Sequence, residues 1–142
     1  MSLIAAAGLF RCRASALRAV CDSGRMSDLR RARFARLVRR AIADLPERYR
    51  QRMRNVEIVI EDEPDPARAT EGELLGLYEG VPLTERREEP WLPDRISIYR
   101  RPIEAMSSSP QVQAKIVRDT VIHEIAHHFG ITDERLDELG RS

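Results

Sequence analysis

Two histidines four residues apart are the side chains of this sequence best suited to bind a metal ion. Residues 123–133 read His-Glu-Ile-Ala-His-His-Phe-Gly-Ile-Thr-Asp. On a helix, side chains at positions i and i+4 project from the same face, so His123 and His127 can offer nitrogens to one ion. A catalytic zinc site has three protein ligands and leaves its fourth position to water. The third ligand must therefore come from elsewhere in the chain.

Gly130 and Asp133 can complete this ligand set. Glycine tolerates the left-handed conformation that ends a helix and turns the chain back over its last turn. We expect such a turn at Gly130 to bring Asp133 to the same ion. Three other acidic side chains could replace Asp133 if the turn runs differently, namely Glu134, Asp137 and Glu138. The spacing from the glycine favours Asp133.

Glu124 is the candidate general base. It lies about 100° around the helix from His123, which suits it poorly for ligation but lets it reach a metal-bound water. Zinc lowers the pKa of that water, and Glu124 can take its proton as the hydroxide attacks a carbonyl. The proton can then pass to the leaving amine. With only three histidines in the chain, chance would produce His-Glu-x-x-His with a probability of about one in a hundred or less.

A structural role is the alternative for these histidines, since both could be satisfied core residues on a buried helix. The third histidine, His128, lies about 100° from His127 and points towards the side that carries Val117 and Val121. We expect His128 to pack, or to form a hydrogen bond that supports the site, rather than to bind the metal.

The motif resembles that of the small zincin-like metallopeptidases, His-Glu-x-x-His-x-x-Gly-x-x-Asp. Segments 74–84, 92–100 and 130–136 also look like this family, and the resemblance covers about residues 27–142. It implies an α+β fold of the reduced zincin type. In that fold an N-terminal amphipathic helix and a small three- to four-stranded mixed sheet pack on a central active-site helix. It also implies Zn²⁺ on His123, His127 and Asp133, with Glu124 as base.

The sequence departs from the metzincins in two respects. Their third ligand is a histidine where Asp133 stands, and they have a methionine-containing turn after the motif, whereas the last methionine here is Met106. An aspartate ligand offsets part of the zinc charge and makes the metal a weaker Lewis acid. We therefore expect modest catalytic power.

Two functions follow as hypotheses. The first is a zinc-dependent peptidase that hydrolyses peptides or unfolded proteins through a metal-activated water. The alternative is a zincin-like zinc-binding protein with little or no catalytic activity. Glu124 favours the enzyme, because a structural zinc site needs no base and closes its fourth position with another strong ligand.

Length and composition favour one domain at residues 26–142, preceded by a poorly structured extension at 1–25. The chain has 142 residues, of which 42% are hydrophobic and 33% charged, as is ordinary for a soluble domain. The apolar run Leu3–Phe10 is too short to cross a bilayer and follows no positive charge. We expect a cytoplasmic monomer that does not bind membranes, with Cys12 and Cys21 as incidental thiols.

Basic side chains are concentrated in the first part of the chain. Residues 1–54 carry 14 basic and 4 acidic side chains, and residues 55–142 carry 10 and 19. Clustered arginines can bind nucleic-acid phosphates. However, the apolar residues of 28–45 recur every three or four positions, which predicts an amphipathic helix with arginines on its outer face. We therefore expect no specific nucleic-acid binding.

The remaining patterns predict the elements that must position the motif. A short helix follows Pro46 to about Met53, and alternating apolar residues predict strands at 56–60, 74–78 and 95–100, the last stopped by Pro102. Ser109 and Pro110 predict the start of the motif helix, and 132–139 a final helical turn.

A sheet edge could hold the substrate. In zincins such an edge commonly pairs with an extended peptide, and by resemblance the strand at 74–78 or that at 95–100 could do so. Tyr78 and Tyr99, which lie in these strands, are candidates for stabilising an oxyanion, although a strand tyrosine is more often packed.

Overall fold

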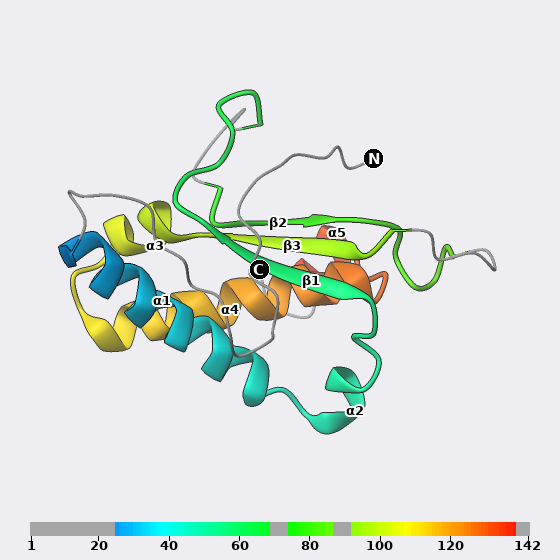
Figure 1. Ribbon diagram of the computed structural model, residues 1–142. Coiled ribbons are helices and arrows are strands. Elements are labelled where there is room, and N and C mark those ends of the chain that lie inside the picture. The colour runs from blue at the N-terminus through cyan, green and yellow to red at the C-terminus, as the bar shows by residue number, and fades with distance from the viewer. Residues whose placement is uncertain (1–24, 69–73, 87–91, 139–142) are drawn as a thin grey trace.

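A computed structural model describes residues 25–68, 74–86 and 92–138 of the chain. Figure 1 shows its helices and strands. In chain order they are α1 (Arg25–Ala43), α2 (Glu47–Arg50), β1 (Val56–Glu61), β2 (Gly76–Glu79), β3 (Asp94–Tyr99), α3 (Arg100–Met106), α4 (Pro110–His128) and α5 (Asp133–Glu138).

The strands form a three-stranded mixed sheet in the order β1-β3-β2. β1 runs parallel to β3 with Ile58 opposite Ile96, and β2 runs antiparallel to β3 with Tyr78 opposite the same Ile96. The chain passes from β1 to the far edge and then returns to the middle. As a result, β2 keeps one edge with which none of the described strands pairs.

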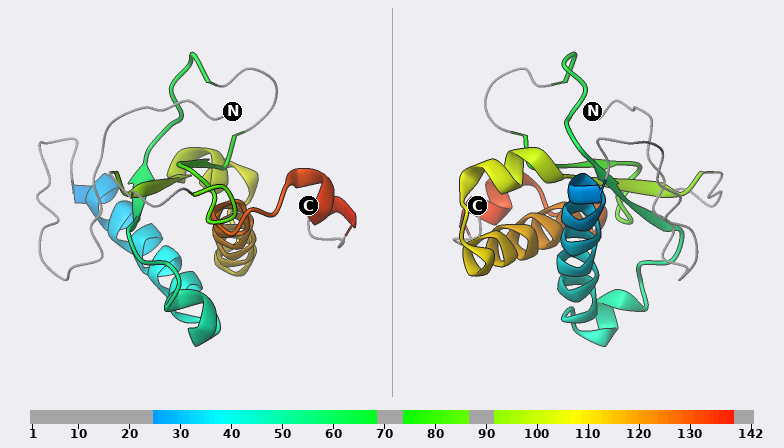
Figure 2. Two further views of the ribbon diagram at one scale, coloured as in Figure 1. Left: turned by 90° about the vertical axis from the view of Figure 1, so that its right-hand side faces the viewer. Right: turned by 60° about the vertical axis from the view of Figure 1, so that its left-hand side comes forward.

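Helices α1 and α4 pack on the same face of this sheet, as the views in Figures 1 and 2 show. Both helices and all three strands contribute apolar side chains to one core. Its members include Phe34, Val38, Ile58, Tyr78, Ile96, Ile98, Val117, Val121 and Ile125. Burying one such aliphatic or phenylalanine side chain contributes about 1.5–3 kcal/mol. This packing makes α4 a rigid support for the motif that it carries.

The predicted α+β fold class is confirmed, with an N-terminal amphipathic helix and a sheet packed on the motif helix. On α1 the apolar stripe is buried and five arginines are exposed, namely Arg30, Arg33, Arg36, Arg39 and Arg40. The helix begins at Arg25 and ends at Ala43, close to the predicted range.

The prediction that Pro102 stops the third strand is wrong. β3 ends at Tyr99, and α3 begins at Arg100 with Pro102 as its third residue. The first turn of a helix has amide groups without intrahelical partners, so a proline there removes no hydrogen bond. The second strand was also placed too early, because β2 starts at Gly76 and ends at Glu79.

Several predictions concern residues outside the described part of the chain. Among them are the extension at 1–25 with its two cysteines, Cys12 and Cys21, so these stay predictions. Of the described helices, none has both the length and the apolar character needed to cross a membrane.

Asp62, directly after β1, connects two helices to the sheet. Its Oδ1 accepts a hydrogen bond from Arg100 Nε at 3.0 Å and lies 3.4 Å from Arg31 Nη1. The Arg100 side chain is buried, and its Nη1 also donates to Glu104 at 2.8 Å. Partial burial raises the pKa of the Asp62 carboxyl, but the hydrogen bond from Arg100 and the charges of the neighbouring arginines outweigh burial, so the pKa is lowered.

We expect Asp62→Asn to reduce the free energy of unfolding by about 1 kcal/mol at neutral pH, a modest value because the carboxylate is partly exposed. A group whose pKa is lowered by folding stabilises the native state above its unfolded pKa of about 3.9 and loses this effect as pH falls. Urea unfolding should therefore show a smaller difference between variant and wild type near pH 3. Glu63→Gln, in an exposed pair with Arg101, is the control and should change little.

Candidate metal centre

His123, Glu124 and His127 lie on the last two turns of α4 (Pro110–His128), and Gly130 and Asp133 follow it. Ser109 caps this helix by accepting a hydrogen bond from the backbone of Val112 at 3.4 Å, and Pro110 occupies its first turn, as predicted. Val117, Val121 and Ile125 are buried in the core. The helix is thus fixed on one side while its other side carries His123 and His127.

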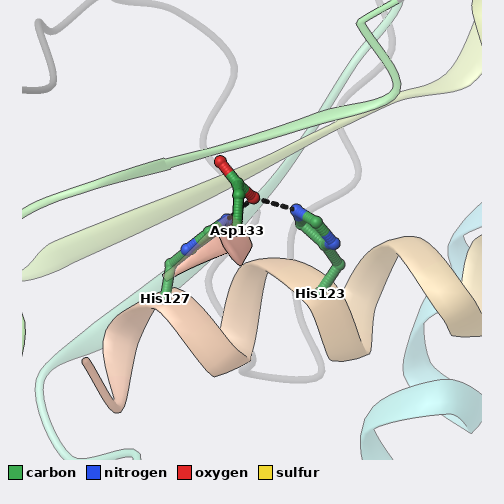
Figure 3. A group of neighbouring side chains, drawn as sticks. All are labelled: His123, His127 and Asp133. Atoms are coloured by element: carbon green, nitrogen blue, oxygen red, sulfur yellow. Dashed lines mark ion pairs between the residues drawn. The ribbon is translucent and has the colours of Figure 1, made fainter. Parts of the chain in front are cut away.

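The side chains of His123, His127 and Asp133 point towards one another, as Figure 3 shows. Both histidine Nε2 atoms lie 3.1 Å from Oδ1 of Asp133, and the three candidate ligand atoms all lie within 4.8 Å of one another. Around a tetrahedral zinc ion with bonds of about 2 Å, ligand atoms are roughly 3.3 Å apart. The donor set and its spacing therefore fit a zinc ion.

A left-handed turn brings Asp133 to the histidines. Gly130 has φ +83°, and its amide donates to the carbonyl of His127 at 2.9 Å after the last turn of α4. The chain then reverses, and α5 begins at Asp133 itself. In the described part of the chain, the metal-binding group found is the one that includes Asp133 and not Glu134, Asp137 or Glu138.

A backbone carbonyl orients one of the candidate ligands. Nδ1 of His127 lies 2.9 Å from the carbonyl oxygen of Ile131, in the turn that follows α4. A carbonyl oxygen can only accept, so Nδ1 must carry the proton of a neutral imidazole, and the lone pair is then on Nε2. The turn that delivers Asp133 therefore also sets the tautomer of His127.

Glu124 lies beside this group but faces the sheet. Its residue exposure is 7%, and its side chain contacts β2 at Gly76, where an added Cβ would lie 3.0 Å from Cγ of Glu124. Burial raises the pKa of Glu124 to about 7, a backbone hydrogen bond from Tyr78 opposes this rise, and the charge of Asp133 adds to it. The missing side chain of Gly76 is what allows the strand to lie so close to the carboxylate.

A pocket of about 390 Å³ opens over the three candidate ligands and Glu124. Its walls come from β2, from α4 with its following turn, and from the segment 80–86, which we call the wall loop. The apolar lining includes Leu74, Leu77, Pro82 and Ile131. A site of this kind can accommodate a small molecule or a short stretch of extended chain.

The two strand tyrosines are packed side chains. The hydroxyl of Tyr78 donates to Oδ2 of Asp94 at 2.9 Å, and burial, together with this carboxylate, raises the pKa of Tyr78. Tyr99 is also buried, and it lies in β3 rather than beside the candidate ligands. Neither geometry supports a role in stabilising an oxyanion.

Asp94 is the residue of this region that the sequence reasoning missed. Its buried Oδ2 accepts hydrogen bonds from the Tyr78 hydroxyl, from Arg86 and, at 2.6 Å, from Nδ1 of His128. His128 is completely buried, as predicted, but its partner could not be foreseen because 34 residues separate the two in the chain. The available signal was an aspartate at the start of a strand whose Ile96 and Ile98 alternate with polar residues.

The same network fixes the wall loop. The amide of Leu83 donates to the carbonyl of His128 at 2.9 Å. Gly80 and Gly130 each lie so close to a side chain, Asp94 and Thr84 respectively, that an added Cβ would overlap with it. Both glycines also have positive φ values of 158° and 83°. The loop is therefore held against β3 at Gly80 and against the end of α4 and its following turn at Leu83 and Thr84.

We expect Asp94→Ala to reduce the free energy of unfolding by about 3 kcal/mol, because it leaves the buried polar groups of His128 and Tyr78 without their acceptor. Chemical denaturation followed by circular dichroism would measure this change. Asp119→Asn, on an exposed part of α4, is the control for loss of a carboxylate and should have little effect. Equal stability of Asp94→Ala and wild type would contradict the role given to this network.

The sequence comparisons agree with this geometry. The family model of the zincin-like metallopeptidases matches residues 53–141, which is more than half of the chain. The matched part includes the sheet, the wall loop, Asp94 and the whole candidate metal centre, whereas α1 precedes it. No individually curated protein matches the chain. The chain belongs to the zincin-like metallopeptidase family.

Proposed function

We propose that this protein is a zinc-dependent peptidase that uses Glu124 as its general base. The observation that carries the proposal is the convergence of His123, His127 and Asp133 at the floor of a pocket that Glu124 also lines. Zinc bound there would activate a water molecule for attack on a peptide carbonyl, polarise that carbonyl and stabilise the charge that develops on its oxygen.

The side chains of the protein would contribute to the reaction by positioning the reacting groups and by transferring a proton. Glu124 lies about 100° around α4 from His123 and is not one of the three candidate ligands, so its carboxylate can accept a proton from the attacking water. It can return that proton to the nitrogen of the leaving amine. Gly76 and the backbone of Tyr78 hold the carboxylate in place, which reduces the reorganisation needed during the reaction.

The sheet topology narrows the choice of substrate-binding strand. β3 is paired on both sides, by β1 and β2, and therefore has no edge to offer a peptide. β2 has an edge that pairs with none of the described strands, and its residues Gly76, Leu77 and Tyr78 line the pocket. We assign the main-chain contacts of an extended substrate to β2.

Exposure of Asp133 favours the second candidate function, a zinc-binding protein with little activity. Its side chain is 69% exposed, so the protein encloses this ligand less than the two histidines. The negative charge of an aspartate ligand also offsets part of the metal charge and weakens the Lewis acidity on which hydrolysis depends. The two functions differ in whether Glu124 affects turnover.

We expect Glu124→Gln to keep zinc but to lower kcat/KM about a thousandfold, because it removes the base and retains the shape of the side chain. His123→Ala should lose both zinc and hydrolysis. Mass spectrometry of peptide libraries digested by metal-loaded protein would measure cleavage, and elemental analysis after dialysis would measure zinc. Asp119→Asn, also on α4, is the matched control and should behave as wild type.

Two results would argue against this mechanism. Equal turnover by wild type and Glu124→Gln would exclude Glu124 as the base. Stoichiometric zinc on a wild-type protein that cleaves no library peptide would support the binding protein instead.

A further inference from the structure

The wall loop places a carboxylate in the pocket that the proposed chemistry does not use. Glu85 lines the pocket, is exposed, and takes part in no ion pair among the described residues. We propose that the carboxylate of Glu85 selects peptide substrates that carry a lysine or arginine at one position near the scissile bond. This inference rests on the peptidase function proposed above.

The position of Glu85 is fixed by contacts on both sides of it in the chain. Leu83 donates to the carbonyl of His128, and Thr84 lies against Gly130. On the other side, Arg86 binds Asp94, and its Nε donates to the carbonyl of Val81 at 3.0 Å. These contacts fix the backbone at Glu85, so only the rotamers of its exposed side chain must be ordered when the carboxylate binds a partner.

Glu85 has no lysine or arginine as a partner among the described residues that line the pocket. The nearest arginine in sequence, Arg86, is directed to the buried Asp94 and is therefore already compensated. The carboxylate of Glu85 is left to interact with whatever enters the pocket.

The rest of the lining suits the stem of a long basic side chain. Leu74, Leu77, Pro82 and Ile131 provide apolar surface between β2 and the end of α4. Lysine and arginine bury their methylene groups on such surface while their charged ends reach a polar partner. An aliphatic substrate side chain would use the apolar surface alone and gain nothing from Glu85.

The charges of α5, which borders the pocket, add to the preference for basic substrates. α5 begins at Asp133, which lines the pocket, and carries three further acidic residues and one arginine, Arg135, which is paired with Glu138 at 2.7 Å. Clustered charge of one sign attracts ligands of the opposite sign and speeds their association. Cationic peptides should therefore be favoured both on approach and in the pocket.

The experiment uses fluorogenic peptides that are identical except for lysine, glutamine or glutamate at each position around the cleaved bond. For wild type loaded with zinc, we expect kcat/KM to be highest for lysine at one position. Glu85→Gln should lower that value about five- to tenfold and leave the glutamine peptide unchanged. Glu85→Arg should reverse the preference towards glutamate. Glu63→Gln, which removes an exposed carboxylate elsewhere, should match wild type.

A binding measurement separates this inference from the proposed function. Fluorescence anisotropy with the same lysine peptides and zinc-free protein should show about fivefold weaker binding to Glu85→Gln, with a difference that shrinks in high salt. The inference would be overturned if kcat/KM or affinity were the same for lysine and glutamine peptides, or the same for wild type and Glu85→Gln. Either result would leave the proposed peptidase function unaffected. Failure to cleave any peptide would count against the peptidase, and the binding result would still decide the role of Glu85.

Discussion

Three electron-rich atoms from one short segment must face one another for this site to exist. Neutral imidazole nitrogens and a carboxylate oxygen present lone pairs, so their convergence is unfavourable unless a proton or a cation lies between them. The fold holds them together because α4 is packed into the core on one side and the turn at Gly130 reverses the chain on the other. The remaining features of the site depend on this forced proximity.

The support for that proximity lies in a second, buried set of polar contacts. Asp94 receives donors from β2, from the wall loop and from the end of α4. Because a buried carboxylate is stable only when its lone pairs are satisfied, these three parts of the chain must stay in register with β3. The histidine that binds Asp94 directly follows a candidate ligand, so the same helical turn faces both the pocket and the core.

Much of the site could be predicted from the sequence because the residues that form it are close together in the chain. His123, His127, Gly130 and Asp133 lie within eleven residues, and helical periodicity with one glycine turn is enough to bring them together. The fold class was implied by the resemblance to the zincin-like family, while local patterns predicted the amphipathic α1 and the capped start of α4. Pro102 misled the prediction, since a proline ends a strand and opens a helix equally well.

The contributions that escaped prediction depend on contacts between distant parts of the chain. The partnership of Asp94 with His128, the approach of Gly76 to Glu124 and the pairing of Asp62 with Arg100 are set by the sheet order. Nothing in the composition of the three strands specifies that the last of them lies in the centre. Strand order follows from the whole arrangement of helices, which a pattern of one segment does not contain.

The contact between β2 and Glu124 joins two parts of the chain whose folding requires different amounts of loop closure. The segment that carries the three candidate ligands is contiguous and needs almost no loop closure, whereas β2, which packs against Glu124, comes from much earlier in the sequence. Partial unfolding that frees this strand would leave the histidines on their helix but expose Glu124 to water. Such a molecule would keep the three candidate ligands together after Glu124 had lost its buried surroundings, so the two walls of the pocket would come apart at separate steps of unfolding.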